Sequence, residues 1–223
     1  MTSETRDVGE EDIGTLRRQV RIVVLLHAAD RAGLTPLPIL RLHTFAFLSN
    51  VLAPVWRLPP LDGKLLKRRG GPFYPALQLD LDRLVGMGVA RISGLSHAKD
   101  EGDRWRLEGA YELNEPLARA ALARASELDE EWRIFTFVQE LAFALSALTD
   151  HELDTAMMED ATYADPVVGV GNVIDFAEWQ DKNWSASAAG YFERVMPSGV
   201  AATPGEKIHM YVRHLHARLN RAG

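Results

Sequence analysis

The chain contains no cysteine. This absence excludes a disulfide-stapled scaffold, a thiolate metal site and a cysteine nucleophile. Long apolar runs are absent as well, because the longest strongly apolar run, Ile22–Leu26, is far too short to span a bilayer. The polar, acidic start of the chain does not have the apolar centre of a signal peptide. We therefore expect a cytoplasmic protein that makes no membrane contact.

Motifs that carry common enzyme chemistry are also scarce. Gly169–Val170–Gly171 has no third glycine and is a weak sign of dinucleotide binding, and Asp62–Gly63–Lys64 fits part of a nuclease core but lies in a proline-rich stretch. His209 and His216 share a helix face at a spacing of roughly 10 Å, too far apart for one metal ion. The acidic pair Glu159–Asp160 is expected to be solvated surface. These observations predict no catalytic residue, no cofactor and no metal.

Charge is unevenly distributed, although the net charge of −6 is modest. Residues 13–69 contain ten Lys or Arg against two acids, whereas residues 126–165 contain eleven acids against Arg133 alone. The overall acidity argues against a protein that coats nucleic acid. The asymmetry indicates two faces with different partners or a polar assembly, and the alternative is two solvated faces.

Apolar spacing predicts three helices in the first third of the chain. Residues 13–32 carry an amphipathic stripe, and Thr35–Pro36 is a start signal for a second helix that extends to about residue 52. Residues 53–74 are rich in proline and glycine and are expected to form a loop. A third helix should occupy residues 75–86, with Pro75 in its first turn.

A β-hairpin is expected after the third helix. Residues 90–92 and 105–107 alternate apolar and polar side chains, as half-buried strands do, and a short third strand is expected around residues 111–113. Three helices followed by a hairpin are the order of a winged-helix domain. We place this domain at residues 13–113, after an acidic flexible tail at residues 1–12.

The remainder, residues 114–223, is predicted to be a helical C-terminal domain. Its expected helices lie at residues 116–148 (one long or broken helix), 150–162, 174–184, 186–195 and from about 205 onward, with a turn at 166–171. The predicted fold class is therefore mainly α with a small β-hairpin wing, a winged-helix domain followed by a helical region.

The stretch at residues 132–148 has an unusually wide apolar arc, and acids precede it at residues 127–131. A helix covered by one core usually needs a narrower stripe, so the surplus should be covered by this chain or by another. An all-round buried helix is the alternative. The residues that we assign to self-association or partner docking are the aromatic ones: Trp132, Phe135, Phe137 and Phe143.

The predicted winged helix does not carry the charges of a DNA reader. Its third helix offers Gln78, Leu79, Asp82 and Arg83 with Asp80 nearby, and its wing tip combines Lys99 with Asp100, Glu101 and Asp103. Carboxylates on both expected contact elements would approach phosphates of their own sign. We expect only weak, sequence-independent DNA contact, or contact with a protein partner, through the basic residues Arg17, Arg18, Arg21, Lys64, Lys67, Arg68 and Arg69.

Several segments together resemble one family. They are Arg41–Trp56, Leu58–Arg68, Gly70–Pro75, Leu81–Val85, Leu153–Pro166 and Val173–Trp179. They are similar to the middle component of bacterial ABC-three-component systems. The resemblance implies a non-enzymatic winged-helix adaptor that links an ATPase of the ABC/SMC type to a separate effector protein in anti-phage or anti-plasmid defence. The alternative is a dimeric winged-helix DNA-binding transcriptional regulator.

Overall fold

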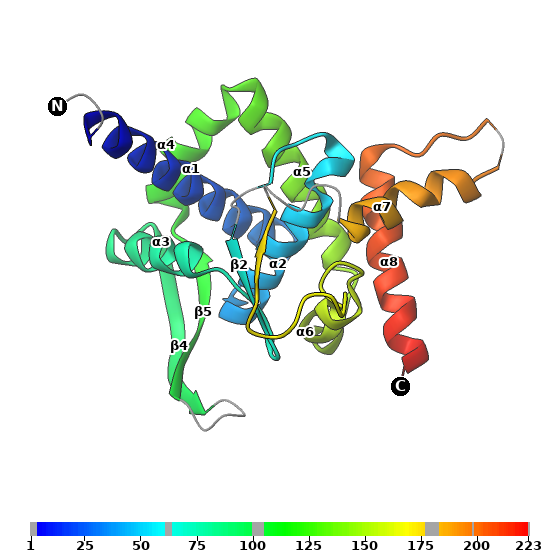
Figure 1. The fold of residues 1–223 in the computed structure, drawn as a ribbon. Coiled ribbons are helices and arrows are strands. Elements are labelled where there is room, and N and C mark those ends of the chain that lie inside the picture. Colours follow the sequence, from blue (N-terminus) through cyan, green and yellow to red (C-terminus); the bar gives the residue numbers. More distant parts are fainter. Residues whose placement is uncertain (1–3, 61–63, 100–104, 177–182, 198, 223) are drawn as a thin grey trace.

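The computed structural model describes residues 4–60, 64–99, 105–176, 183–197 and 199–222. Within them the fold is mainly helical with two small antiparallel sheets, in agreement with the mainly α class expected (Figure 1). The helices are α1 (Glu4–Arg31), α2 (Ile39–Leu52), α3 (Pro75–Gly86), α4 (Glu115–Ser126), α5 (Asp129–Leu145), α6 (Asp150–Glu159), α7 (Trp184–Tyr191) and α8 (Pro204–Ala222). The strands are β1 (Leu37–Pro38), β2 (Lys64–Arg68), β3 (Gly71–Phe73), β4 (Ala90–Lys99), β5 (Trp105–Leu113) and β6 (Val173–Asp175).

The first two helices differ from expectation at their starts. Helix α1 begins at Glu4 rather than at residue 13, so most of the expected flexible tail is helical. Thr35–Pro36 does not start the second helix, because Leu37 and Pro38 first pair with Tyr111 and Ala110 of β5 as strand β1. Helix α2 then follows from Ile39 and is buried on most of its circumference.

The first sheet has the strand order β1–β5–β4. The expected hairpin is confirmed, with Ala90 of β4 opposite Leu113 of β5 and Lys99 opposite Trp105. The strand expected around residues 111–113 is the end of β5 itself, since β5 continues unbroken to Leu113. The wing-tip acids Asp100, Glu101 and Asp103 lie outside the described residues.

The second sheet corrects two expectations. Residues 64–73 form the β2–β3 hairpin rather than a loop, and residues 173–175 form β6 rather than the start of a helix. The sheet order is β3–β2–β6, with Leu65 opposite Ile174. Both of these side chains are fully buried, so packing decides the local conformation of two segments that lie more than a hundred residues apart in the sequence.

The C-terminal helices pack against the N-terminal ones. The stretch at 116–148 is broken into α4 and α5, and α1 packs against both, while α8 packs against α5, α6 and α7. One hydrophobic cluster includes Leu25 of α1, Phe47 of α2, Phe137 of α5 and Tyr211 of α8. The boundary expected at residue 113 therefore separates the two parts along the chain, whereas in space they share a core.

One stretch, Ile39–Trp56, is long and apolar enough to cross a bilayer. It includes α2, and 67% of it is buried inside the fold. This burial is typical of the central helix of a folded core.

Candidate binding surfaces

The structure divides the seven basic residues assigned from the sequence into exposed and buried groups. Arg17, Lys64, Arg68 and Arg69 are exposed and Arg18 is half-buried. Arg21 and Lys67 are buried, so neither side chain is placed to meet a phosphate on the surface. Burial lowers the pKa of Arg21 to about 10, although the charges of Glu131 and Glu130 oppose this effect.

The burial of Lys67 follows from the alternation of side chains along β2. Leu65 and Lys67 point to the core side of the sheet, whereas Lys64, Leu66 and Arg68 point outward. The Lys67 ammonium donates to the carbonyl oxygen of Asp165 at 3.2 Å and lies 5.2 Å from the centre of the Tyr163 ring. Burial lowers its pKa, and the charge of Asp165 opposes this effect. Lys67 thus links β2 to the turn after α6 through this hydrogen bond.

The outer face of the second sheet combines apolar and basic side chains. Leu66 is paired with Phe73 of β3 on one side and with Val173 of β6 on the other, so the three side chains form one cross-strand row. The Arg68 guanidinium lies 3.6 Å from the centre of the Phe73 ring, in cation–π contact. Lys64 is exposed at the opposite end of β2.

Helix α3 has a different charge pattern from the one that we expected. Asp80 is not near the exposed face but fully buried, and it accepts from Arg18 Nε at 2.7 Å and from Arg83 Nη1 at 2.9 Å. The acid on the outer face is Asp82, which accepts a hydrogen bond from Gln78 at 2.9 Å. Arg83, the basic residue of this face, is therefore already engaged with a carboxylate.

Exposed apolar side chains lie on the outer surface of α3 and directly after its C-terminal end. Leu79 and Met87 are 53% and 55% exposed, and Arg83 lies between them at a spacing of four residues from each, whereas Asp82 lies beside Leu79. Leu117 of α4, 56% exposed, extends this surface, because one of its methyl carbons lies 3.5 Å from the place where a side chain on Gly88 would begin. We call Leu79, Met87 and Leu117 the α3 surface.

The aromatic residues of α5 do not form one surface. Phe137 is fully buried and packs against the Trp56 ring at 6.0 Å, so its assignment to an interface is wrong. Phe135 is half-buried between the rings of His27 and Trp132. Trp132 and Phe143 are 51% and 41% exposed. The wide apolar arc is thus mostly core, and these two side chains remain on its margins.

A buried polar network that the sequence did not reveal joins α6, α7 and α8. Asp160, expected to be solvated, is fully buried and accepts hydrogen bonds from the backbone N–H groups of Thr162 and Tyr163, from Ser185 and from Tyr211. Burial raises the pKa of the Asp160 carboxyl against these donors. Because Ser185, Thr162 and Tyr211 are buried too, the network holds the helices together and presents no reactive group to a ligand.

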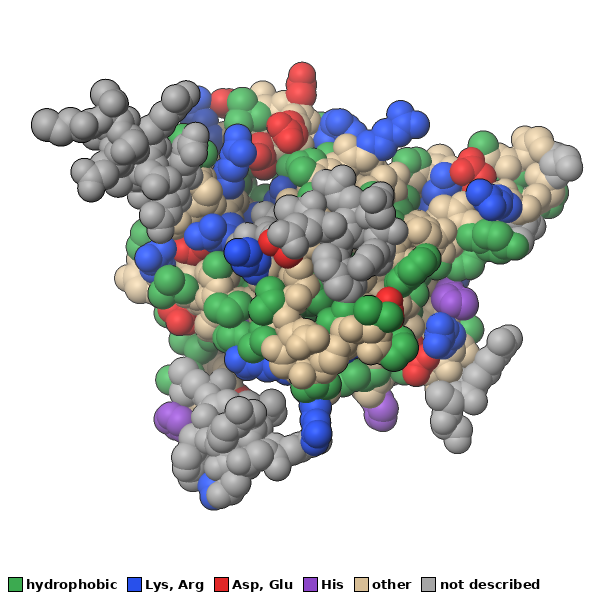
Figure 2. All heavy atoms as spheres, in the orientation of Figure 1, with side chains coloured by type: hydrophobic (Ala, Val, Ile, Leu, Met, Phe, Trp, Pro, Cys, Tyr) green, Lys and Arg blue, Asp and Glu red, His purple; other side chains and the backbone are tan. Residues whose placement is uncertain are grey.

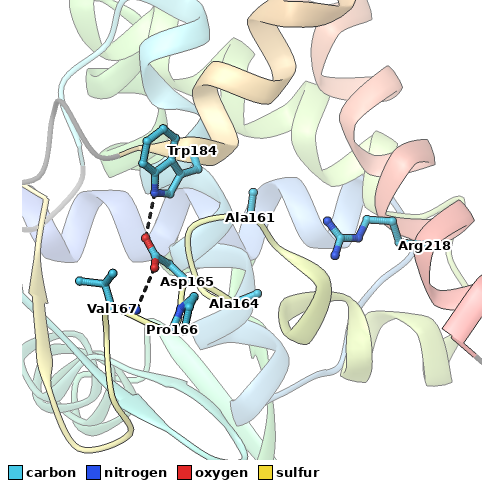
Figure 3. A pocket seen from close by; sticks show the side chains of 7 residues that line it. All are labelled: Ala161, Ala164, Asp165, Pro166, Val167, Trp184 and Arg218. Atoms are coloured by element: carbon cyan, nitrogen blue, oxygen red, sulfur yellow. Dashed lines mark hydrogen bonds between the residues drawn. The ribbon is translucent and has the colours of Figure 1, made fainter.

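An open cavity of about 540 Å³ lies beside this network, at the turn after α6 (Figure 3). Trp184 and Val167 flank Asp165, which accepts from the Trp184 indole at 2.8 Å and from the Val167 backbone at 2.9 Å. Arg218 lines the cavity from α8 and pairs with Glu159 at 3.0 Å. Both carboxylate oxygens of Asp165 and the Arg218 guanidinium thus already have protein partners.

His209 and His216 of α8 each pair with a glutamate of a different neighbouring helix. His209 lies 3.4 Å from Glu140 of α5, and His216 lies 2.7 Å from Glu152 of α6. Within the part of the chain that the structure describes, no group of three or more His, Asp or Glu side chains could hold a metal ion. These pairs attach α8 to its neighbours.

No family model, no curated protein and no solved structure matches the chain.

Proposed function

We propose that the chain is a winged-helix adaptor that binds other proteins and performs no catalysis. The order α1–β1–α2–α3–β4–β5, together with the sheet order β1–β5–β4, supports this proposal. In such a domain α3 is the recognition helix of the helix-turn-helix and β4–β5 is the wing. The β2–β3 hairpin is then an insertion between the second and third helices.

The α3 surface is the observation that carries the proposal. A helix that reads the major groove offers cations and hydrogen-bond donors to DNA. Here the same position offers Leu79 and Met87, an arginine between them that is already bound to Asp80, and the acid Asp82 beside Leu79. Exposed apolar side chains with a polar margin are typical of protein-binding surfaces.

The sequence resemblance supplies the proposed partners. In the family of middle components, a small winged-helix protein connects an ATPase of the ABC/SMC type to an effector. We propose the same place for this chain, in a bacterial anti-phage or anti-plasmid complex in which the α3 surface contacts one of the two partners.

Reconstitution tests this proposal. The chain is mixed with an ABC/SMC-type ATPase and an effector encoded beside it, and binding is measured by co-elution and by titration calorimetry. The variant L79D/M87D should bind at least about tenfold more weakly, because two charges would enter an apolar contact. The control V170D/V200D alters two exposed apolar residues elsewhere and should bind normally. Equal binding by both variants, or none by the wild type, would contradict the adaptor role.

The second candidate function, a dimeric DNA-binding regulator, depends on the exposed cations Arg17, Lys64, Arg68 and Arg69. Under the adaptor proposal these residues give at most weak phosphate contact that falls steeply with salt and does not distinguish sequences. Fluorescence anisotropy with random and palindromic duplexes separates the two functions. Tight binding to one palindrome at physiological salt would favour the regulator.

A further inference from the structure

Two exposed surfaces of this chain have opposite charge and similar construction. The first, which we call the basic sheet face, consists of Lys64, Leu66, Arg68, Arg69, Phe73 and Val173. Val173 is 57% exposed, and the cross-strand row Val173–Leu66–Phe73 has Lys64 on one side and Arg68 on the other. Arg69 is exposed in the two-residue turn that joins β2 to β3. The face is an apolar row with Arg68 and Arg69 on one side and, on the other, Lys64 opposite Asp175 of β6.

The second surface lies where α4 turns into α5. Its exposed apolar side chains are Leu128, 60% exposed, and Trp132, 51% exposed. Trp132 is held by stacking on Phe135, with the ring centres 5.6 Å apart. Exposed carboxylates surround the pair. We call this surface the acidic corner: Glu127, Leu128, Asp129, Glu130 and Trp132.

The two surfaces lie on different parts of the molecule, since β2 is near the centre of the view in Figure 1. In Figure 1 the α4–α5 turn forms the top of the view, whereas the β2–β3 turn points to the bottom. In Figure 2 acidic (red) and basic (blue) side chains both lie at the top of the view, and a lysine or arginine side chain projects at the bottom. One copy therefore cannot bring its own acidic corner onto its own basic sheet face.

We propose that copies of this chain associate head to tail, with the acidic corner of one copy seated on the basic sheet face of the next. Leu128 and Trp132 would pack on the row Val173–Leu66–Phe73, and the surrounding carboxylates would meet Lys64, Arg68 and Arg69. Apolar centres with complementary charged margins are the usual construction of specific interfaces, and tryptophan is a frequent energetic anchor. This association does not use the α3 surface, so it can be tested independently of the adaptor role.

A head-to-tail contact has a structural consequence. Because the two sides of the interface are different surfaces, each copy in a pair keeps one unused side, and further copies add until a ring closes or a filament grows. Assembly should therefore go beyond a dimer as concentration rises. It should also weaken with salt, because the charges at the margin are exposed.

Sedimentation velocity on the full chain over a range of concentrations and salt tests this proposal. K64E/R69E should weaken association at least about tenfold by placing acids opposite acids. The control R31E/R213E changes the net charge by the same amount at two other exposed arginines and should associate as the wild type does. D129K/E130K reverses the acidic corner, and L128S/W132S removes its apolar side chains while leaving the charges at the start of α5 intact.

Mixing the variants separates a head-to-tail contact from other arrangements. K64E/R69E and D129K/E130K should each be monomeric alone, yet together form a 1:1 complex, because the first retains an intact acidic corner and the second an intact basic sheet face. Its outer surfaces carry reversed charges that complement each other again, so the mixture should assemble further with the two variants alternating. A monomeric wild type at the highest soluble concentration and low salt, or variants that do not recombine although they melt like the wild type, would overturn the proposal.

Discussion

The two small sheets differ in the length of their strands and in the distance along the chain between the strands that they pair. In the first sheet, β4 and β5 are consecutive, and β1 adds two residues at the edge. In the second sheet, β2 pairs with its neighbour β3 on one side and with β6, a hundred residues later, on the other. The first sheet belongs to the proposed winged helix, whereas the second sheet binds the N-terminal part to the C-terminal part.

This difference determines what each sheet contributes. The hairpin of the first sheet closes a short loop, so its formation costs little chain entropy. The pairing of β2 with β6 has to be stabilised by burial, and Leu65 opposite Ile174 provides it, since both side chains are fully buried. We therefore expect damage to the second sheet to affect the whole fold and damage to the first to remain local.

The largest effect is expected for Ile174→Asp, which breaks the second sheet. It removes a fully buried side chain and places a carboxyl opposite Leu65, at a cost of at least about 4 kcal/mol in the free energy of unfolding. The neighbouring change Val173→Asp points outward and should cost less than about 1 kcal/mol. Urea denaturation measures both. Equal and small losses would show that β6 is peripheral.

An intermediate effect is expected from His43, which joins the second sheet to α3. Its ring lies 5.0 Å from that of Phe73, its Nε2 is 3.2 Å from Gln78 Oε1, and its Nδ1 accepts from the Tyr74 backbone. Burial, with a smaller contribution from the charge of Arg68, lowers the pKa of His43 from 6.5 to about 4, although the hydrogen bond to Gln78 opposes the shift.

Because His43 binds its proton more weakly when folded, it stabilises the fold above about pH 6.5. That contribution should be lost as the pH falls toward 4, by up to about 3 kcal/mol. The variant His43→Gln should have a flatter dependence of the free energy of unfolding on pH over this range. The exposed His151→Gln is the matched control and should keep the wild-type slope. An unchanged slope in His43→Gln would contradict the assignment.

The smallest effect is expected for Gly109→Val in the first sheet. A side chain added at Gly109 would begin 2.7 Å from the terminal carbon of Ile92 across the hairpin, so that side chain must move. We expect a loss of about 1–2 kcal/mol, visible as a lower melting temperature in a cooperative transition. Gly190→Ala in α7, where nothing lies within 4 Å, should be neutral or slightly stabilising. Complete unfolding by Gly109→Val would make the hairpin as essential as the second sheet.

Periodic segments were predicted well because their signals are local. The leucine stripe of α3, the break before the hairpin and the wide apolar arc of α5 are each visible within about ten residues. The strand β6 was missed because three residues carry no distinguishable period, and β2 was missed because prolines and glycines surround it. Asp160 looked like surface, since nothing near it in sequence indicates the donors from α7 and α8.

For the candidate surfaces too, the sequence determined some features and the tertiary structure decided others. The sequence by itself determined the residue types: a basic N-terminal third, an acidic middle, and an α3 segment without a net basic charge. Tertiary structure decided which of those charges are available. It buried Arg21 and Lys67, paired Arg18 of α1 with Asp80 of α3, and placed Phe137 in the core while leaving Trp132 exposed. The physical reason is that composition and periodicity act over neighbouring residues, whereas burial and ion pairing depend on which distant segments meet.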